Sequence, residues 1–378
     1  MRNLKREIQS KILKNLKKNK VLVLAGARRV GKTELVKSTI SKLEEPYLLF
    51  NGEDMAVQEL LQRRTVENYK HVLGDKKILI IDEAQKIPEI GLKLKLMIDE
   101  IEGLKILVTG SSAFDVSNKM GEPLTGRMKT IRLFPLSEKE LRETETVTEH
   151  KDRLHQRLIF GNYPELIHLS NIEDKTEYLR ELVDTYLLKD ILALENIRNA
   201  SKIKNLLRLI AFQIGGEVSY QELGTQLGMS KNSVEKYLEL LEKVFVLYKV
   251  EGFSRNLRKE ITKTSRWYFH DNGLRNIIVA NMNALPLRQD VGQLWENYII
   301  SERLKRLSYS EILSNKYFWR TYDQQEIDWV EEREGKLFAF EIKWNPRKKV
   351  KVPAAWEKGY PDSTFVQITQ ANYLEWIL

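Results

Sequence analysis

The N-terminal third of the chain alternates short apolar runs with longer amphipathic stretches. The apolar runs predict strands, and each stretch between two runs is compatible with a helix. Strands separated by helices are typical of a parallel sheet that is covered by helices, so the predicted fold class is α/β. The predicted strands are Val21–Ala25, Tyr47–Phe50, Ile78–Asp82, Lys105–Thr109 and Thr130–Leu133.

Beyond this sheet the pattern of apolar positions changes twice. After Pro135 the spacing of apolar residues is helical, and from about residue 201 the predicted helices are shorter. From about residue 266 the sequence is rich in aromatic residues and strand formers. Neither repeats nor low-complexity linkers mark the boundaries. The pattern predicts an α/β core at 1–136, a helical lid or linker at 137–200, a winged helix at 201–265 and a C-terminal α/β domain at 266–378.

A helix-turn-helix is predicted within the third segment. Ser219 and Ser230 are suited to cap two helices, and Gly228 is suited to the turn between them. Residues 245–250 then form the first wing strand. The outward face of the second helix mixes basic and acidic side chains, so two interpretations stay open: contact with DNA, and a lid or subunit contact within an ATPase.

The amino-acid composition excludes several kinds of functional site. The 378 residues include no cysteine, which excludes disulfides, Cys-ligated zinc, iron–sulfur clusters and a thiol nucleophile. The five histidines are scattered, so zinc chemistry is unsupported. The longest apolar runs are far below the roughly 18–20 residues of a membrane-spanning helix. We therefore expect a cytoplasmic protein with no membrane partner. The net charge of +9 permits attraction to DNA, although an ordinary solvated surface explains it equally well.

A complete phosphate-binding loop follows the first strand. The sequence matches GxxxxGK[ST], and a helix-compatible stretch comes directly after it. In this motif the backbone N–H groups face phosphate, the lysine reaches the β- and γ-phosphates, and the hydroxyl ligates Mg²⁺. The predicted nucleotide ligands are Gly26, Ala27, Arg28, Arg29, Val30, Gly31, Lys32 and Thr33.

A second motif supports hydrolysis. The apolar strand at 78–82 ends in Asp82 and Glu83, which we predict to hold Mg²⁺ and to orient the attacking water. No guanine-reading segment is present, so ATP is the predicted nucleotide and Mg²⁺ the predicted metal. The later strand at 105–109 predicts one strand between the phosphate loop and the Asp-Glu strand.

Three further residues are candidates for catalysis at this site. Ser111 and Ser112 follow the strand at 105–109 and place hydroxyls near the γ-phosphate. Arg127 lies on a glycine- and proline-containing stretch and suits stabilisation of transition-state charge, in the same subunit or in a neighbour. Pairing of Arg127 with surface carboxylates is the alternative.

The last third of the chain contains a second group of residues that could form a catalytic site. Glu296 opens a helix, while Asp328 and Glu341 lie on two strands that a polar turn joins into a hairpin. Side chains two apart on a strand share a face, so Glu341 and Lys343 point the same way. Two carboxylates that share Mg²⁺, with a lysine to orient water, form a minimal phosphodiester-cleaving site. The alternative is a structural ion pair in a domain that only binds a partner.

These motifs occur in one order along the chain, together with GRM…LFPLSEKEL and GNYPE. In this order the sequence resembles the prokaryotic AAA+-type ATPases that carry a winged helix and a C-terminal domain of unknown function with a PD-(D/E)xK nuclease-like fold. The resemblance covers nearly all of the chain. It implies nucleotide binding at the phosphate loop, a sensor at Ser111 or Ser112, and a nuclease-like core at Glu296, Asp328, Glu341 and Lys343.

Two functions follow as hypotheses. The first is an ATPase whose cycle moves a winged helix and a nuclease-like domain on DNA. The second is an ATP-driven switch or assembly protein, acting as a homo-oligomer or on another protein, whose C-terminal domain is catalytically silent.

Overall fold

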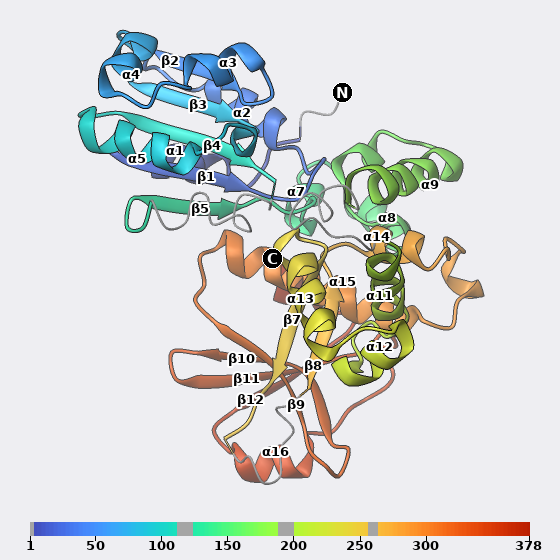
Figure 1. Ribbon diagram of the computed structural model, residues 1–378. Coiled ribbons are helices and arrows are strands. Elements are labelled where there is room, and N and C mark those ends of the chain that lie inside the picture. The colour runs from blue at the N-terminus through green and yellow to red at the C-terminus, as the bar shows by residue number, and fades with distance from the viewer. Residues whose placement is uncertain (1–3, 112–123, 188–199, 256–263) are drawn as a thin grey trace.

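The computed structural model describes residues 4–111, 124–187, 200–255 and 264–378. Two sheets dominate this part of the chain, one in the N-terminal third and one in the C-terminal half (Figure 1). A group of helices lies beside them and connects the two. The α/β prediction is confirmed for the N-terminal sheet.

The N-terminal sheet is parallel throughout, with the strand order β2-β3-β4-β1-β5. One strand, β4, therefore separates the phosphate-loop strand β1 from the Asp-Glu strand β3, which confirms the predicted order. The three central strands are buried almost completely, as apolar runs covered on both faces should be. The strands are β1 (Lys20–Ala25), β2 (Tyr47–Asn51), β3 (Ile78–Asp82), β4 (Lys105–Gly110) and β5 (Met128–Arg132).

Helices cover both faces of this sheet (Figure 1). Several begin where the sequence offers a cap: the side chains of Asp54 and Thr65 accept backbone N–H groups at the starts of α3 and α4. The helical elements are α1 (Gln9–Asn15), α2 (Lys32–Ile40), α3 (Met55–Leu60), α4 (Val66–Leu73), η1 (Ala84–Lys86) and α5 (Ile90–Glu100).

The helical segment after β5 contains two complete capping boxes. In the first, Ser137 accepts from the N–H of Glu140 and the Glu140 side chain accepts from the N–H of Ser137; Thr146 and Glu149 repeat the arrangement. These boxes fix where α7 and α8 begin. The elements are α7 (Glu138–Arg142), α8 (Val147–Phe160), η2 (Pro164–Ile167), α9 (Ile172–Glu181) and the π-helical turn η3 (Leu182–Leu187).

The two helices of the predicted helix-turn-helix are present. Ser219 and Ser230 cap them, and Gly228 takes the left-handed conformation (φ 58°) between them. The strand predicted at residues 245–250 begins two residues later, at Leu247, because Phe245 has φ 53° and cannot join an extended strand. The elements are α11 (Ala200–Phe212), β6 (Glu217–Val218), α12 (Tyr220–Leu227), α13 (Lys231–Lys243), β7 (Leu247–Gly252) and β8 (Ser265–Phe269).

The second sheet is mixed and runs through both halves of this region, in the order β12-β11-β10-β9-β7-β8-β6. Parallel pairing of β7 with β9, Glu251 opposite Tyr317, joins the helix-turn-helix strands to the C-terminal strands. The sheet therefore crosses the predicted boundary at 265/266, and the domain limits stay predictions. The remaining elements are α14 (Asn272–Ile278), η4 (Leu285–Leu287), α15 (Val291–Tyr309), β9 (Asn315–Arg320), β10 (Glu326–Arg333), β11 (Lys336–Ile342), α16 (Ala354–Gly359), β12 (Thr364–Ile368) and α17 (Tyr373–Ile377).

The long helix α15 ties the second sheet to the segment that follows β5. The hydroxyl of Tyr309 accepts from the N–H of Phe134 at 3.0 Å, and Lys305 Nζ donates to the carbonyl of Leu136 at 2.9 Å. The N–H of Glu138 donates to Glu302 Oε2 at 2.8 Å. The residues in these three bonds are all buried, so the bonds fix the junction between the two halves of the molecule.

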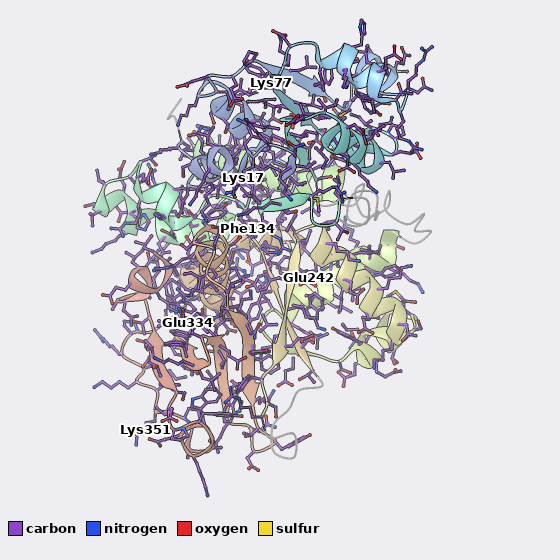
Figure 2. The ribbon with its side chains drawn as sticks, turned by 90° about the vertical axis from the view of Figure 1, so that its left-hand side faces the viewer. Lys17, Lys77, Phe134, Glu242, Glu334 and Lys351 are labelled. Carbon is purple, nitrogen blue, oxygen red and sulfur yellow. The ribbon has the colours of Figure 1, made fainter. Side chains whose placement is uncertain are left out.

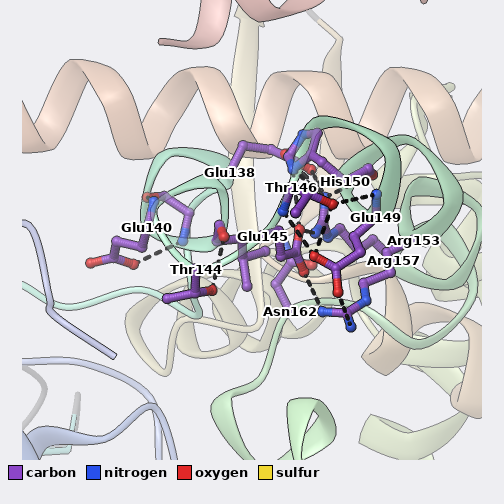
Figure 3. Close-up of polar contacts among 12 residues, drawn as sticks. Glu138, Glu140, Thr144, Glu145, Thr146, Glu149, His150, Arg153, Arg157 and Asn162 are labelled. Atoms are coloured by element: carbon purple, nitrogen blue, oxygen red, sulfur yellow. Dashed lines mark hydrogen bonds and ion pairs between the residues drawn. The ribbon is translucent and has the colours of Figure 1, made fainter. Parts of the chain in front are cut away.

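Beside this junction lies a buried network of charged side chains, drawn in Figure 3. His150 lies between two carboxylates, with Nε2 2.6 Å from Glu138 Oε2 and Nδ1 3.2 Å from Glu145 Oε2. Arg157 pairs with the same two carboxylates. Burial lowers the pKa of His150, but its bonds to Glu138 and Glu145 more than offset this, so the pKa is raised overall. The contacts with Glu138 and Glu145 therefore favour the protonated form of His150.

Candidate ATP site and a second carboxylate cluster

The phosphate loop lies between the end of β1 and the start of α2. Its first glycine is required by close packing, because a Cβ on Gly26 would lie 2.4 Å from the carbonyl oxygen of Leu133. Its second glycine is required by conformation, since Gly31 has φ 93°. Both glycines allow the backbone to curl in front of the helix N-terminus, where N–H groups face outward.

Lys32 is 5% exposed and bends back over the loop. Its Nζ donates to the carbonyl oxygens of Gly26 and Ala27, each at 3.0 Å. The ammonium group thus lies inside the curl of the loop. From there it can contact phosphate oxygens, which the motif assigns to this lysine.

The end of the neighbouring strands supplies oxygen donors. Thr33 Oγ1 donates to Asp82 Oδ2 at 2.7 Å, and the hydroxyl of Thr109, at the end of β4, donates to Asp82 Oδ1. A hydroxyl beside a carboxylate is the donor set that Mg²⁺ prefers, with nucleotide phosphates and water completing its shell. The residues present therefore fit a Mg²⁺–nucleotide complex.

Glu83 follows directly, in a strained backbone conformation with φ 49°. Thr109 Oγ1 accepts from the N–H of Glu83 at 3.0 Å, while Gln85 Nε2 donates to Glu83 Oε2 at 2.5 Å. Gln85 also donates to Ser111 Oγ at 3.3 Å. These bonds orient the carboxylate at the carboxyl edge of the sheet. Gln85 and the bridging role of Thr109 were missed at sequence level, because neither falls inside a motif.

The other candidates for this site differ in placement. Ser111 is 2% exposed at the end of β4, whereas Ser112 lies outside the described residues. Arg127 lies at the opposite, amino edge of the sheet, since Met128 is opposite Val21 at the start of β1. There its Nε pairs with Asp99 Oδ1 at 2.6 Å. Within its own subunit Arg127 therefore does not reach the phosphate loop, because the full length of β1 separates them.

Two arginines hold the loop against the helical segment. Arg29, inside the loop, lies over the ring of Tyr178 on α9 (5.5 Å to the centroid). Arg6, from before α1, is 8% exposed and donates from Nη1 to the carbonyl of Val30 at 2.7 Å. It also donates to the carbonyl of Phe134 at 2.7 Å and to Glu140 Oε1 at 3.0 Å. No motif marks Arg6, and its role comes entirely from contacts with distant residues.

The C-terminal candidates lie on one face of the second sheet. Antiparallel pairing of β10 and β11, Trp329 opposite Phe340, brings Asp328 beside Glu341. Lys343 Nζ lies between them, 3.2 Å from Asp328 Oδ2 and 2.6 Å from Glu341 Oε1. The other carboxylate oxygen of Glu341, Oε2, is buried and makes no hydrogen bond within the described residues.

Strand β8 adds two residues that sequence reasoning missed. Tyr268 donates its hydroxyl hydrogen to Glu296 Oε1 at 2.7 Å, and Arg266 Nη1 lies 3.7 Å from Asp328 Oδ1. Alternation along β8 places both side chains on the same face, yet only the pairing of β7 with β9 brings that face to Asp328. No local signal could have found them.

The pKa shifts in this cluster reflect its burial and the closeness of its charged groups. Burial and the Asp328 charge raise the pKa of Glu296 to about 8, and the same two causes raise that of Glu341 to about 7. Burial alone lowers the pKa of Lys343, but the charges of Asp328 and Glu341 raise it overall. Glu296 is therefore mostly protonated at neutral pH, while Lys343 stays charged.

Comparison with protein families divides the chain into three segments. Residues 18–142 match a family model described as "AAA domain", so this part of the chain is similar to AAA-type ATPase domains. Residues 151–285 and 291–372 match two families described as domains of unknown function, DUF8612 and DUF4143.

Relatives match along most of their length. An uncharacterized protein of Mycobacterium tuberculosis is 24% identical over 342 residues, covering 90% of this chain and 74% of its own. An uncharacterized protein of Methanocaldococcus jannaschii is 24% identical over 379 residues, which cover 94% of this chain and 81% of that protein. Among solved structures, a Walker-type ATPase of Pyrococcus abyssi aligns with 73% of this chain and 95% of its own at 17% identity and a TM-score of 0.47.

A membrane-spanning helix must be both long and apolar. Within residues 4–111, 124–187, 200–255 and 264–378, no helix is both long enough and apolar enough to cross a bilayer.

Proposed function

We propose that this chain binds ATP with Mg²⁺ and hydrolyses it. The observation that carries the proposal is the contact between Thr33 and Asp82 at 2.7 Å, which joins the phosphate loop to the carboxylate at the end of the Asp-Glu strand. Lys32 and the loop N–H groups hold the phosphates, while Thr33 and Asp82 hold Mg²⁺ directly or through water. The bound metal supplies charge neutralisation on the phosphate oxygens.

Glu83 is the proposed catalytic base. Water attacks the γ-phosphorus, the bond from phosphorus to the bridging oxygen breaks, and ADP leaves with the electron pair of that bond. The water proton passes to the Glu83 carboxylate. Gln85 and Thr109 hold Glu83 in place through its side chain and its N–H, and Ser111 extends the same network.

Substitution separates binding from hydrolysis. Lys32→Ala removes the ammonium group from the loop and abolishes nucleotide binding, whereas Glu83→Gln keeps binding and lowers turnover by about 10²-fold or more. Lys95→Ala is the control, because Lys95 is an exposed lysine on α5. Phosphate release and binding of a labelled ATP analogue are measured side by side. Full turnover by Glu83→Gln would refute the assignment of the base.

We further propose that the ATP cycle acts on DNA through the helix-turn-helix. The charge of +9 and the exposed Lys231, Asn232 and Lys236 on α13 support this, although Glu235 lies among them. The test is a DNA titration at two salt concentrations, with and without a non-hydrolysed ATP analogue. A steep salt dependence supports phosphate contact, and absence of binding in both nucleotide states rejects it.

A second candidate function is phosphodiester cleavage at the C-terminal carboxylates. The unpartnered, buried Oε2 of Glu341 favours it, because such an atom lacks the hydrogen bond that burial normally requires. Within the described part of the chain no three acidic or histidine side chains lie close enough to hold a metal together. A cation here therefore takes Asp328 and Glu341 as protein ligands and water for its remaining positions, with Lys343 orienting water.

Cleavage assays decide between this function and a silent domain. Wild type and Asp328→Asn are incubated with single-stranded, double-stranded and branched DNA in Mg²⁺ or Mn²⁺, with Glu334→Gln, at the exposed hairpin turn, as control. Cleavage by wild type and the control but not by Asp328→Asn supports the nuclease. No cleavage under any nucleotide condition leaves the switch or assembly protein, for which ATP turnover persists and the oligomeric state changes with ATP.

A further inference from the structure

A cavity of about 830 Å³ lies where the AAA-type domain meets the second sheet. Its lining comes from α1 and β5 on one side, and from α13, β7, α15, β9 and β10 on the other. Figure 2 labels one residue from each side, Phe134 and Glu242, at the level where the upper and lower bodies meet. The volume is in the range of pockets that hold small organic ligands.

One part of the cavity wall is aromatic. Phe134, Tyr248 and Phe245 surround the ring of His270, with centroid distances of 5.5, 5.0 and 6.1 Å. All four side chains are at most 8% exposed. Phe245 is also held at φ 53°, a conformation that bulky residues avoid unless their surroundings impose it.

The other part of the wall is basic. Five Lys or Arg side chains and two carboxylates line it among the described residues: Lys11, Arg132, Lys243, Lys249, Lys316, Glu242 and Glu311. Glu311 is already paired with Lys129 outside the lining, at 2.8 Å. Within the part of the chain that the structure describes, Arg132 and Lys316 form no ion pair with any carboxylate. These two cations therefore face the cavity without a carboxylate partner, and Arg132 lies over the ring of Phe245 (5.8 Å to the centroid).

The two unpaired cations lie close enough to affect their neighbours. Burial, and after it the charge of Arg132, lowers the pKa of Lys316. Burial and Arg132 also lower the pKa of His270 to about 3, with Lys305 adding to the effect, so His270 is a neutral imidazole at physiological pH. The cavity thus combines a positive field at Arg132 and Lys316 with a neutral aromatic wall.

We propose that this cavity binds a nucleotide unit, with its phosphate on Arg132 and Lys316 and its base against the aromatic wall. Phosphate satisfies the unpaired cations, and a planar ring packs on Phe134, Phe245 and Tyr248 as bases stack on aromatic side chains. Inorganic phosphate uses only the cations, and an apolar ligand uses only the rings. The source is either a free nucleotide or a nucleotide within single-stranded nucleic acid, since both present the same chemistry.

The site is distinct from the phosphate loop but linked to it. Phe134 offers its ring to the cavity, while its carbonyl accepts from the same Arg6 guanidinium that binds the carbonyl of Val30 in the loop. The inference goes beyond the proposed function, because it concerns neither the outward face of α13 nor the Asp328 cluster.

The test removes the phosphate loop from the measurement. In a Lys32→Ala background, fluorescence polarisation follows a labelled short oligothymidylate and a labelled deoxynucleoside monophosphate. The double variant Arg132→Gln with Lys316→Gln weakens binding by about tenfold or more, since each loses a charge-assisted contact. The slope of log affinity against log salt for the oligonucleotide falls by about 0.7, because the two cations neutralise one phosphate.

Controls make the outcome specific. Lys77→Gln changes an exposed lysine at the far end of the N-terminal sheet, as Figure 2 shows, and leaves both probes bound as before. Phe245→Leu keeps an apolar side chain but removes the ring, and weakens binding without changing the salt slope. If only the monophosphate responds to the double variant, the occupant is a free nucleotide; if only the oligonucleotide responds, it is single-stranded nucleic acid.

Two results overturn the proposal. The first is equal affinity of the double variant and Lys77→Gln for both probes. The second is competition by inorganic phosphate as strong as that by the monophosphate, which shows that the rings contribute nothing. Thermal unfolding of each variant shows whether it is folded, and ATP turnover measured with Lys32 restored tests the proposed ATPase separately.

Discussion

Arg6 provides the sharpest quantitative prediction for stability. Its guanidinium makes three hydrogen bonds, to the carbonyls of Val30 and Phe134 at 2.7 Å and to Glu140 Oε1 at 3.0 Å. Arg6 is 8% exposed and Glu140 only 1%. Burial alone lowers the pKa of Arg6, but Glu140 and Tyr309 raise it overall, so the group is charged at every accessible pH.

The loss of unfolding free energy expected for Arg6→Ala comes from the buried groups that lose their hydrogen-bond partner. Glu140 loses its cation while it stays buried, and breaking a buried pair from one side costs about 3–5 kcal/mol. The two carbonyls add to this only where water cannot enter. Arg127→Ala is the control, because it breaks an ion pair whose arginine is 43% exposed, and such pairs contribute about 0–1 kcal/mol.

The assay is urea unfolding followed by circular dichroism, with the affinity for an ATP analogue measured in parallel. The chain contains two sheets, so the transition that includes the N-terminal sheet must be identified by its response to nucleotide. Arg6→Ala lowers the midpoint of that transition and weakens nucleotide binding, because Val30 belongs to the phosphate loop. A loss of stability no larger than that of Arg127→Ala would refute the reasoning.

Three further predictions concern single groups. Thr109→Val removes the donor to Asp82 and the acceptor for the Glu83 N–H, so ATP turnover falls by about tenfold, while Thr109→Ser restores it; steady-state kinetics measure both. His150→Gln destabilises the chain most below pH 6.5, and the difference from wild type disappears as pH rises through the raised pKa of His150. Urea unfolding at several pH values measures this difference. A difference that grows with pH would contradict a stabilising imidazolium. Because the pKa of Glu296 is raised to about 8, wild type loses stability as pH rises from 4.5 towards 8. Glu296→Gln removes the part of this dependence that Glu296 contributes and leaves the parts that Glu341 and His150 contribute. An unchanged slope in Glu296→Gln would contradict the assignment.

Local structure was predictable wherever neighbouring residues determine it. The apolar runs identified the strands of the N-terminal sheet, and Ser219, Gly228 and Ser230 identified the helix-turn-helix, because caps and turns are local. The phosphate loop could be found for the same reason, since its function depends on consecutive residues. Strand limits moved by two residues at Phe245, where a positive φ ended the extended conformation.

The surroundings of each site were not predictable. Arg6 reaches residues 24, 128 and 134 positions away, and no sequence pattern encodes such pairings. Arg266 and Tyr268 reach the C-terminal carboxylates only because β7 pairs with β9, a contact between strands distant in sequence. The position of Arg127 could not be predicted either. Whether it lies at the amino or the carboxyl edge of the sheet is determined by the pairing of β5 with β1.

The pairing of β7 with β9 also limits how this chain can be divided. Two family models meet near residue 290, which suggests a convenient place to separate the segments. A fragment ending there would leave β7 with an unpaired edge, and one beginning there would leave β9 in the same state. Exposed strand edges promote aggregation. Biochemical work on either segment should therefore keep residues 200–378 together, and a soluble fragment that ends near residue 290 would show that the shared sheet is dispensable.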